Sequence, residues 1–169
     1  MLQPQDPDWQ ARIRDSFDRQ HFMRYLQAVM TRAEPGRVEI AVPFRPELTQ
    51  QHGFFHAGVA TSIADSAGGY AGFSLFPRNS SVLTVEFKVN LLNPARGDRL
   101  RAVGQVIKHG RTLTVCDLRV IAMTGDEAVL CASGQQTLFC LHGRPDEAAI
   151  RDRGEDKKPS NSAARVPDQ

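Results

Sequence analysis

The amino-acid sequence predicts an α+β domain in which one antiparallel sheet curls around a single central helix. Two observations carry this prediction. A helical run from His56 to about Phe76 consists largely of small side chains, which suits a helix enclosed tightly by its neighbours. Four long segments of alternating polar and apolar residues follow it, separated by short turns. Short turns join antiparallel neighbours, so the helix and these strands together indicate the α+β class.

The first expected element is an amphipathic helix over residues 7–33. Apolar side chains recur there at nearly helical spacing among charged residues, and Glu34-Pro35-Gly36 ends the run. Such a helix could bind a membrane surface or a partner, but packing on the domain is the commoner use of an apolar stripe. We therefore expect the helix to cover the core.

A strand over residues 37–42 is expected next, then a loop over residues 43–55 and the small-residue helix. This helix contains Gly68, Gly69 and Gly72. A glycine inside a helix costs about 1 kcal/mol relative to alanine, so a neighbouring backbone should approach closely enough to offset that cost. A sheet wrapped around the helix would provide this approach.

Four strands are expected after the helix, over residues 81–92, 98–108, 111–123 and 127–141, and their short connections indicate an antiparallel meander. In the first of them, alternation places Leu83, Val85, Phe87, Val89 and Leu91 on one face and Thr84, Glu86, Lys88 and Asn90 on the other. A long apolar edge of this kind is an aggregation hazard that native proteins cover or pair. Pairing with a second copy of the chain is the simplest cover.

Composition bounds the domain and its surroundings. One domain is expected over residues 1–143, with a core at about 36–141, and the charged, proline-containing residues 144–169 predict a disordered tail. The formal net charge of +2 indicates no nucleic-acid partner. The charged N-terminal residues lack a secretory signal and no apolar run is long enough to span a membrane, so a cytoplasmic location is expected.

The three cysteines, Cys116, Cys131 and Cys140, match neither a redox pair nor a zinc site in their spacing. We interpret them as reduced residues of strands. His52 and His56 lie four residues apart but have no evident third ligand, so no metal site is expected.

Asp65 is the candidate catalytic residue of the central helix. Aspartate is a poor residue for a helix interior, and this one lies among Ile63, Ala64 and Ala67 instead of on a charged face. A carboxylate in apolar surroundings must be paired or have a function. The alternative is a structural hydrogen bond to a neighbouring hydroxyl.

His56-Ala57-Gly58 stands at the start of the same helix. The first backbone N–H groups of a helix lack intrahelical acceptors and the dipole is positive there, so this turn can hold an oxyanion or a carbonyl oxygen. Gly58 would let a ligand approach the backbone closely, although a tight entry turn alone would also explain it.

Five segments, taken in order and spacing, resemble the phenylacetate-degradation (PaaI-like) branch of the hotdog-fold thioesterases. They are Gln51–Val59 (QHGFFHAGV), Ile63–Gly69 (IADSAGG), Leu83–Leu91 (LTVEFKVNL), Pro94–Asp98 (PARGD) and Lys108–Thr112 (KHGRT). The similarity runs from about residue 36 to residue 139. It implies a hotdog fold and a homodimer whose sheets join edge to edge, often paired again into a homotetramer.

The resemblance also implies hydrolysis of acyl-CoA thioesters at the dimer interface, with no cofactor or metal. It assigns Asp65 to activate water or to attack the thioester, and the backbone N–H of Ala57 or Gly58 to polarise the carbonyl. Thr84 would support the aspartate across the interface. Gln50 stands where the family often has asparagine, fifteen residues before the aspartate, and its longer side chain moves the amide.

Coenzyme A carries phosphates, and residues 88–119 hold seven basic side chains against two acidic ones. Lys88, Lys108 and Arg111 are the candidate phosphate contacts, although a solvated strand face would also carry such residues. His56, Gln51 and Asn90 complete the expected substrate-binding positions.

Two other functions fit the same fold, because a fold does not determine function. One is a non-catalytic module that binds or senses acyl-CoA. A sensor that controls transcription would need a DNA-binding appendage, and a single-stripe helix does not form a helix-turn-helix. The other is a hotdog hydratase, which would need an Asp/His dyad placed differently from this motif.

Overall fold

A computed structural model describes residues 2–146 of the protein. The elements in chain order are α1 (Trp9–Arg19), α2 (His21–Leu26), β1 (Val29–Glu34), β2 (Arg37–Pro43), the short 3₁₀ helix η1 (Pro46–Leu48), α3 (Ala57–Phe73), β3 (Ser80–Leu91), β4 (Arg99–His109), β5 (Leu113–Thr124) and β6 (Glu127–His142). The expected disordered tail falls almost entirely on residues 147–169, outside the described part of the chain.

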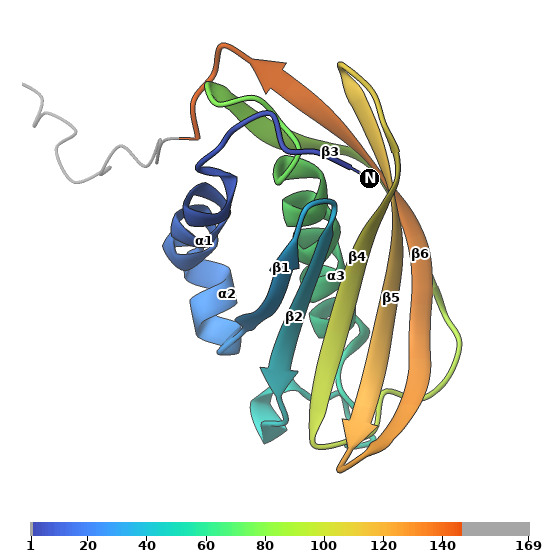
Figure 1. Cartoon of the computed structure of the whole chain (residues 1–169). Helices are drawn as coiled ribbons and strands as arrows, with labels where there is room; N and C mark the ends of the chain where they lie inside the picture. Colours follow the sequence, from blue (N-terminus) through green and yellow to red (C-terminus); the bar gives the residue numbers. More distant parts are fainter. Residues whose placement is uncertain (1, 147–169) are drawn as a thin grey trace, which may run out of the picture.

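The strands form one antiparallel sheet in the order β1-β2-β4-β5-β6-β3, and α3 lies inside the curve of this sheet (Figure 1). The predicted α+β arrangement is confirmed. The predicted four-strand meander is wrong for β3, because β3 pairs with β6 at the edge of the sheet whereas β4 pairs with β2 and β5. Residues 92–98 therefore carry the chain from the β3 edge past β6 and β5 to β4.

The single helix expected over residues 7–33 is also wrong. α1 ends at Arg19, α2 ends at Leu26, and Gln27 has a left-handed backbone with φ 56°. The remaining residues form β1, which pairs with β2 across a tight turn at Gly36, where φ is 74°. A short apolar pattern suits a helix or a strand equally, and cross-strand hydrogen bonds to β2 decide in favour of the strand.

Close packing explains two of the three glycines in α3. A Cβ at Gly68 would collide with Gln136 and Leu118, and a Cβ at Gly72 would collide with Leu138. The colliding atoms belong to side chains, so these two positions do not show the predicted approach of a backbone. That approach is found at Gly104 of β4, where a Cβ would collide with the backbone of Ala67 and Gly68 in α3. Gly69 differs, because a Cβ there would meet nothing within 4 Å.

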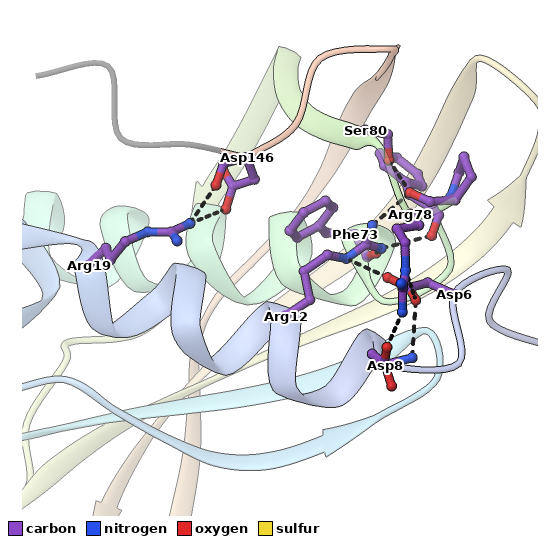
Figure 2. Close-up of polar contacts among 10 residues, drawn as sticks. Asp6, Asp8, Arg12, Arg19, Phe73, Arg78, Ser80 and Asp146 are labelled. Atoms are coloured by element: carbon purple, nitrogen blue, oxygen red, sulfur yellow. Dashed lines mark hydrogen bonds and ion pairs between the residues drawn. The ribbon is translucent and has the colours of Figure 1, made fainter.

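The N-terminal helix α1 is anchored to the C-terminal end of α3 by Arg12 (Figure 2). Its guanidinium donates hydrogen bonds to the carbonyl oxygens of Phe73, Phe76 and Pro77 at 3.2, 2.8 and 2.6 Å, and lies 4.4 Å from the Phe73 ring centroid. Phe73 is the last residue of α3, and Phe76 and Pro77 follow in the turn after it, so a cation there also complements the helix dipole. At the other end of α1, Arg19 pairs with Asp146 at 2.6 Å.

Candidate functional site

Asp65 lies on α3 with its carboxylate held by two side chains. Thr84 of β3 donates a hydrogen bond to Asp65 Oδ1 at 2.9 Å, and Gln136 of β6 donates to the same oxygen at 2.5 Å. Gln136 Nε2 also lies 3.1 Å from the Asp65 carbonyl oxygen and 2.9 Å from Thr84 Oγ1. Both contacts reach Oδ1, so the carboxylate is fixed in orientation by one oxygen.

Thr84 reaches Asp65 within the same chain. We expected Thr84 of one subunit to support Asp65 of the other. The structure corrects this expectation, because Thr84 donates its hydrogen bond to Asp65 of its own subunit. The expected alternation along β3 holds from Glu86 to Leu91 but is wrong at Leu83 and Thr84, whose faces are exchanged. A β-bulge between Thr84 and Glu86 shifts the register against β6, so that Thr84 pairs with Leu138 and Phe87 pairs with Gln136. Paired residues share a face, so Thr84 and Phe87 both face α3 despite their odd separation.

Gln136 is a site residue that sequence reasoning missed. Its side chain is 0% exposed, and it stands between Gly134 and Leu138 on the inward face of β6. Its amide nitrogen makes the three contacts already described, whereas its Oε1 has no hydrogen-bond partner among the described residues. A polar residue in line with the apolar inward positions of the strand, such as Leu138 and Cys140, was the available signal.

His56 caps the start of α3. Its Nδ1 accepts a hydrogen bond from the Gly58 N–H at 2.9 Å, so that donor is already occupied. The Ala57 N–H has no acceptor among the described residues. Ala57 lines a cavity of about 380 Å³ together with Gln50, beside the end of β3. Of the two backbone donors expected here, the structure therefore leaves the one on Ala57 free.

Asp65 and the start of α3 lie far apart within one chain. Asp65 follows Ala57 by eight residues of helix, which is about 12 Å along the axis at 1.5 Å per residue. A base and an oxyanion donor must both come within about 3 Å of a single reacting carbonyl. The Asp65 and Ala57 of one chain are too far apart to do this together.

The candidate phosphate contacts do not gather at Asp65. The register of β3 against β6 places Lys88 and Asn90 on the face of the sheet opposite α3, and Lys108 lies on that same outer face through its pairing with Val115. Arg111 lies in the turn between β4 and β5. Gln51 is exposed in the loop before α3.

A second cavity, of about 220 Å³, lies directly against Asp65 and Thr84. Helix α3 contributes Gly69 and Tyr70 to its lining, and α1 and its C-terminal cap contribute Ser16 and Gln20. Burial raises the pKa of Tyr70 to about 12, so its hydroxyl stays protonated near neutral pH. The carboxylate therefore faces a small space walled partly by the N-terminal helix.

Other chemistry has little support in the described residues. The three cysteines are free and buried in strands, as predicted, and burial raises the pKa of Cys116 to about 12, which disfavours the nucleophilic thiolate. Over residues 2–146, no three His, Cys, Asp or Glu side chains gather as metal ligands. The same part of the chain has no helix long and apolar enough to cross a membrane.

Comparisons with known proteins identify the family of this chain. The sequence profile of the thioesterase superfamily matches residues 52–129. A Halobacterium salinarum protein that carries the name of an esterase is 31% identical over 119 residues. The match covers 68% of this chain and 78% of that protein. A solved thioesterase family protein from Silicibacter pomeroyi has 47% sequence identity and a TM-score of 0.78, over 80% of this chain and 99% of its own.

The fold is also that of the E. coli PaaI protein from the phenylacetic acid degradation operon. Its TM-score is 0.73 at 18% sequence identity, over 82% of this chain and 96% of PaaI. Together, the matching profile, the 31% identical relative and the 47% identical structure show that this chain is a hotdog-fold member of the thioesterase superfamily, whose common chemistry is thioester hydrolysis.

Proposed function

We propose that the protein hydrolyses acyl-CoA thioesters at a site shared by two copies of the chain, with Asp65 as the catalytic carboxylate. The observation that carries this proposal is the carboxylate itself. It is held by Thr84 and Gln136 through one oxygen and faces a cavity. A carboxylate fixed in this way can take a proton from water or attack a carbonyl carbon.

The shared site follows from the open side of α3. Most of this helix is buried, but the positions Gly58, Thr61, Ser62, Asp65 and Gly69 form a partly accessible stripe. All but one of these side chains are small, so a second α3 could approach closely. If two antiparallel copies of α3 meet about an axis between Thr61 and Ser62, Asp65 of one copy lies level with the partner's Gly58.

The edge strand β3 supports the same arrangement. Leu83 and Val85 are 50% and 51% exposed, and Phe87 and Leu91 are also exposed. An uncovered edge of this length invites pairing with another strand, and a second β3 would extend the sheet across the two-fold axis.

Val85→Lys should therefore weaken dimerisation. We expect it to lower both the average mass measured by light scattering and the thioesterase activity. A stable monomer with full activity would contradict the shared site.

The chemistry then divides between the two copies. The carbonyl oxygen of the thioester accepts a hydrogen bond from the free Ala57 N–H at the positive end of α3, where a donor stabilises developing negative charge. Asp65 of the other copy either takes a proton from the attacking water or attacks the carbonyl carbon directly. The tetrahedral species collapses by breaking the carbon–sulfur bond, and the CoA thiolate leaves and takes up a proton, which Asp65 returns if it acted as the base. If Asp65 attacked directly, water then hydrolyses the acyl anhydride on Asp65, which releases the free acid and restores the carboxylate.

The test is release of free thiol from a panel of acyl-CoAs by wild type, Asp65→Asn and a matched control. Asp126→Asn makes the same change at an exposed turn. We expect Asp65→Asn to bind acyl-CoA but lose nearly all hydrolysis, because an amide is neither a base nor an anionic nucleophile. The control should match wild type. Unchanged turnover in Asp65→Asn would exclude the assignment, and wild type that binds without hydrolysis would indicate a binding module.

A further inference from the structure

The cavity beside Asp65 is small and mostly polar. Its volume is about 220 Å³, and only Gly69 and Val82 of its lining residues lack a polar side chain. For scale, a protein cavity of about 150 Å³ can hold one benzene molecule. A short acyl group therefore fits, whereas most of a long fatty chain or of the pantetheine arm of coenzyme A would lie outside it. Because the cavity touches Asp65, a carbonyl held at that carboxylate would direct its acyl group here.

Helix α1 closes one side of this cavity with a hydrogen-bonded group. Gln20 Nε2 donates to the Tyr70 hydroxyl at 2.9 Å, and Ser16 Oγ lies 3.1 Å from the same hydroxyl. Tyr70 is only 4% exposed and packs edge-on against Phe17 of α1, with ring centroids 5.7 Å apart. The contacts of Arg12 and Arg19 at the two ends of α1 keep this wall in place (Figure 2).

This group has an unused hydrogen-bond donor. The Ser16 and Tyr70 hydroxyls share one hydrogen bond, which uses the hydrogen of only one of them. Whichever hydroxyl donates, the hydrogen of the other has no further acceptor among the described residues. Because Tyr70 remains protonated near neutral pH, that donor persists under working conditions. A ligand acceptor in the cavity would satisfy it.

Charge restricts the ligand further. The cavity is lined by two carboxylates, Asp65 and Asp146, and only Asp146 is paired with a cation, Arg19. An acyl group ending in a carboxylate would be repelled by Asp65. The open space at Gly69 leaves room between Asp65 and Tyr70 for a chain of a few atoms.

We infer that this cavity is the acyl subsite and that Ser16, Gln20 and Tyr70 make it selective for short acyl groups that carry a neutral hydroxyl or amide. The inference rests on the proposed hydrolysis of acyl-CoA thioesters. It assigns a specificity role to the N-terminal helix, whose side chains do not touch the reacting carbonyl.

The test compares kcat/KM for butyryl-CoA, 3-hydroxybutyryl-CoA and octanoyl-CoA. Wild type should prefer the 3-hydroxybutyryl over the butyryl thioester by about tenfold, the worth of one neutral hydrogen bond, and should disfavour the octanoyl thioester. The double change Ser16→Ala with Tyr70→Phe removes both hydroxyls, so it should bring the hydroxybutyryl-to-butyryl ratio toward one. Gln10→Leu, a change at an exposed position of α1, should keep the wild-type ratio.

The outcomes separate the two proposals. If the wild type shows a ratio near one, or if the double variant keeps the ratio of the wild type, the specificity assignment is overturned while hydrolysis stands. Hydrolysis of none of the thioesters by the folded wild type would overturn the proposed function instead. Circular dichroism melting of each variant identifies any change that comes from unfolding, and the wild-type ratio alone decides the assignment if the double variant does not fold.

Discussion

Ala57→Pro removes the backbone N–H proposed to polarise the thioester carbonyl and leaves the helix intact. Ala57 is the first residue of α3, where proline is favoured because its missing N–H has no intrahelical acceptor. The preceding residue, His56, has φ −62° and ψ 139°, an extended conformation that a following proline requires. The Ala57 N–H makes no hydrogen bond among the described residues, so the fold loses none there.

The expected loss is specific to turnover. Removing one oxyanion donor from an enzyme typically lowers kcat by about 10²–10³-fold, and a similar loss is expected for Ala57→Pro. Ala57→Ser keeps the N–H and provides the control. Free-thiol release measures turnover, and thermal melting should show both variants near the wild-type midpoint. Full activity in a well-folded Ala57→Pro protein would refute Ala57 as the donor.

The same variant tests whether two chains share the site. Asp65→Asn and Ala57→Pro chains are each inactive alone, but a mixed dimer contains one site with both groups intact. Unfolding and refolding an equal mixture makes about half of the dimers mixed, so about a quarter of wild-type activity should return. A site contained within one chain would recover none. The fraction of wild-type activity that the refolded mixture recovers therefore distinguishes a shared site, near one quarter, from a site within one chain, near zero.

Three other predictions concern the surroundings of Asp65. Gln136→Leu should lower kcat at least tenfold with a smaller effect on KM, because the carboxylate loses the donor at 2.5 Å that orients it. Gly72→Ala should lower the free energy of unfolding in urea by about 1–3 kcal/mol through collision with Leu138, whereas Gly69→Ala should raise it by up to about 1 kcal/mol. The raised pKa of Tyr70 means that its protonated form favours the folded state, so stability should fall as pH rises from about 10 toward about 12. Tyr70→Phe should remove this part of the high-pH loss, and an unchanged pH dependence would exclude Tyr70 as its source.

Much of the fold could be predicted because it depends on local patterns. Alternation located the strands, with observed bounds close to those expected for β4 and β6, and the small residues of α3 predicted its enclosure by the sheet. The position of β3 could not be predicted in this way. Whether β3 lies beside β4 or β6 depends on hydrogen bonds to residues about fifty positions away, and local alternation is the same in both cases.

The candidate site was only partly predictable for a related reason. Asp65 stood out because a carboxylate in apolar company needs a partner, and Thr84 came from the family resemblance. The bulge that turns Thr84 toward Asp65 leaves no mark in a simple alternating pattern. The contact from Gln136 joins residues 71 positions apart. Such a partner is identified only when the strands are placed.

The sequence by itself determined the class of fold, the central helix and the carboxylate on it, since these follow from side-chain size, periodicity and the cost of an unpaired buried charge. Only the tertiary structure decided which edge β3 occupies, which side chains hold Asp65, that the Gly58 N–H is occupied while the Ala57 N–H is free, and that α1 walls the cavity. The physical reason is that these features depend on register and on hydrogen bonds between distant segments, which form only when the whole sheet closes around α3.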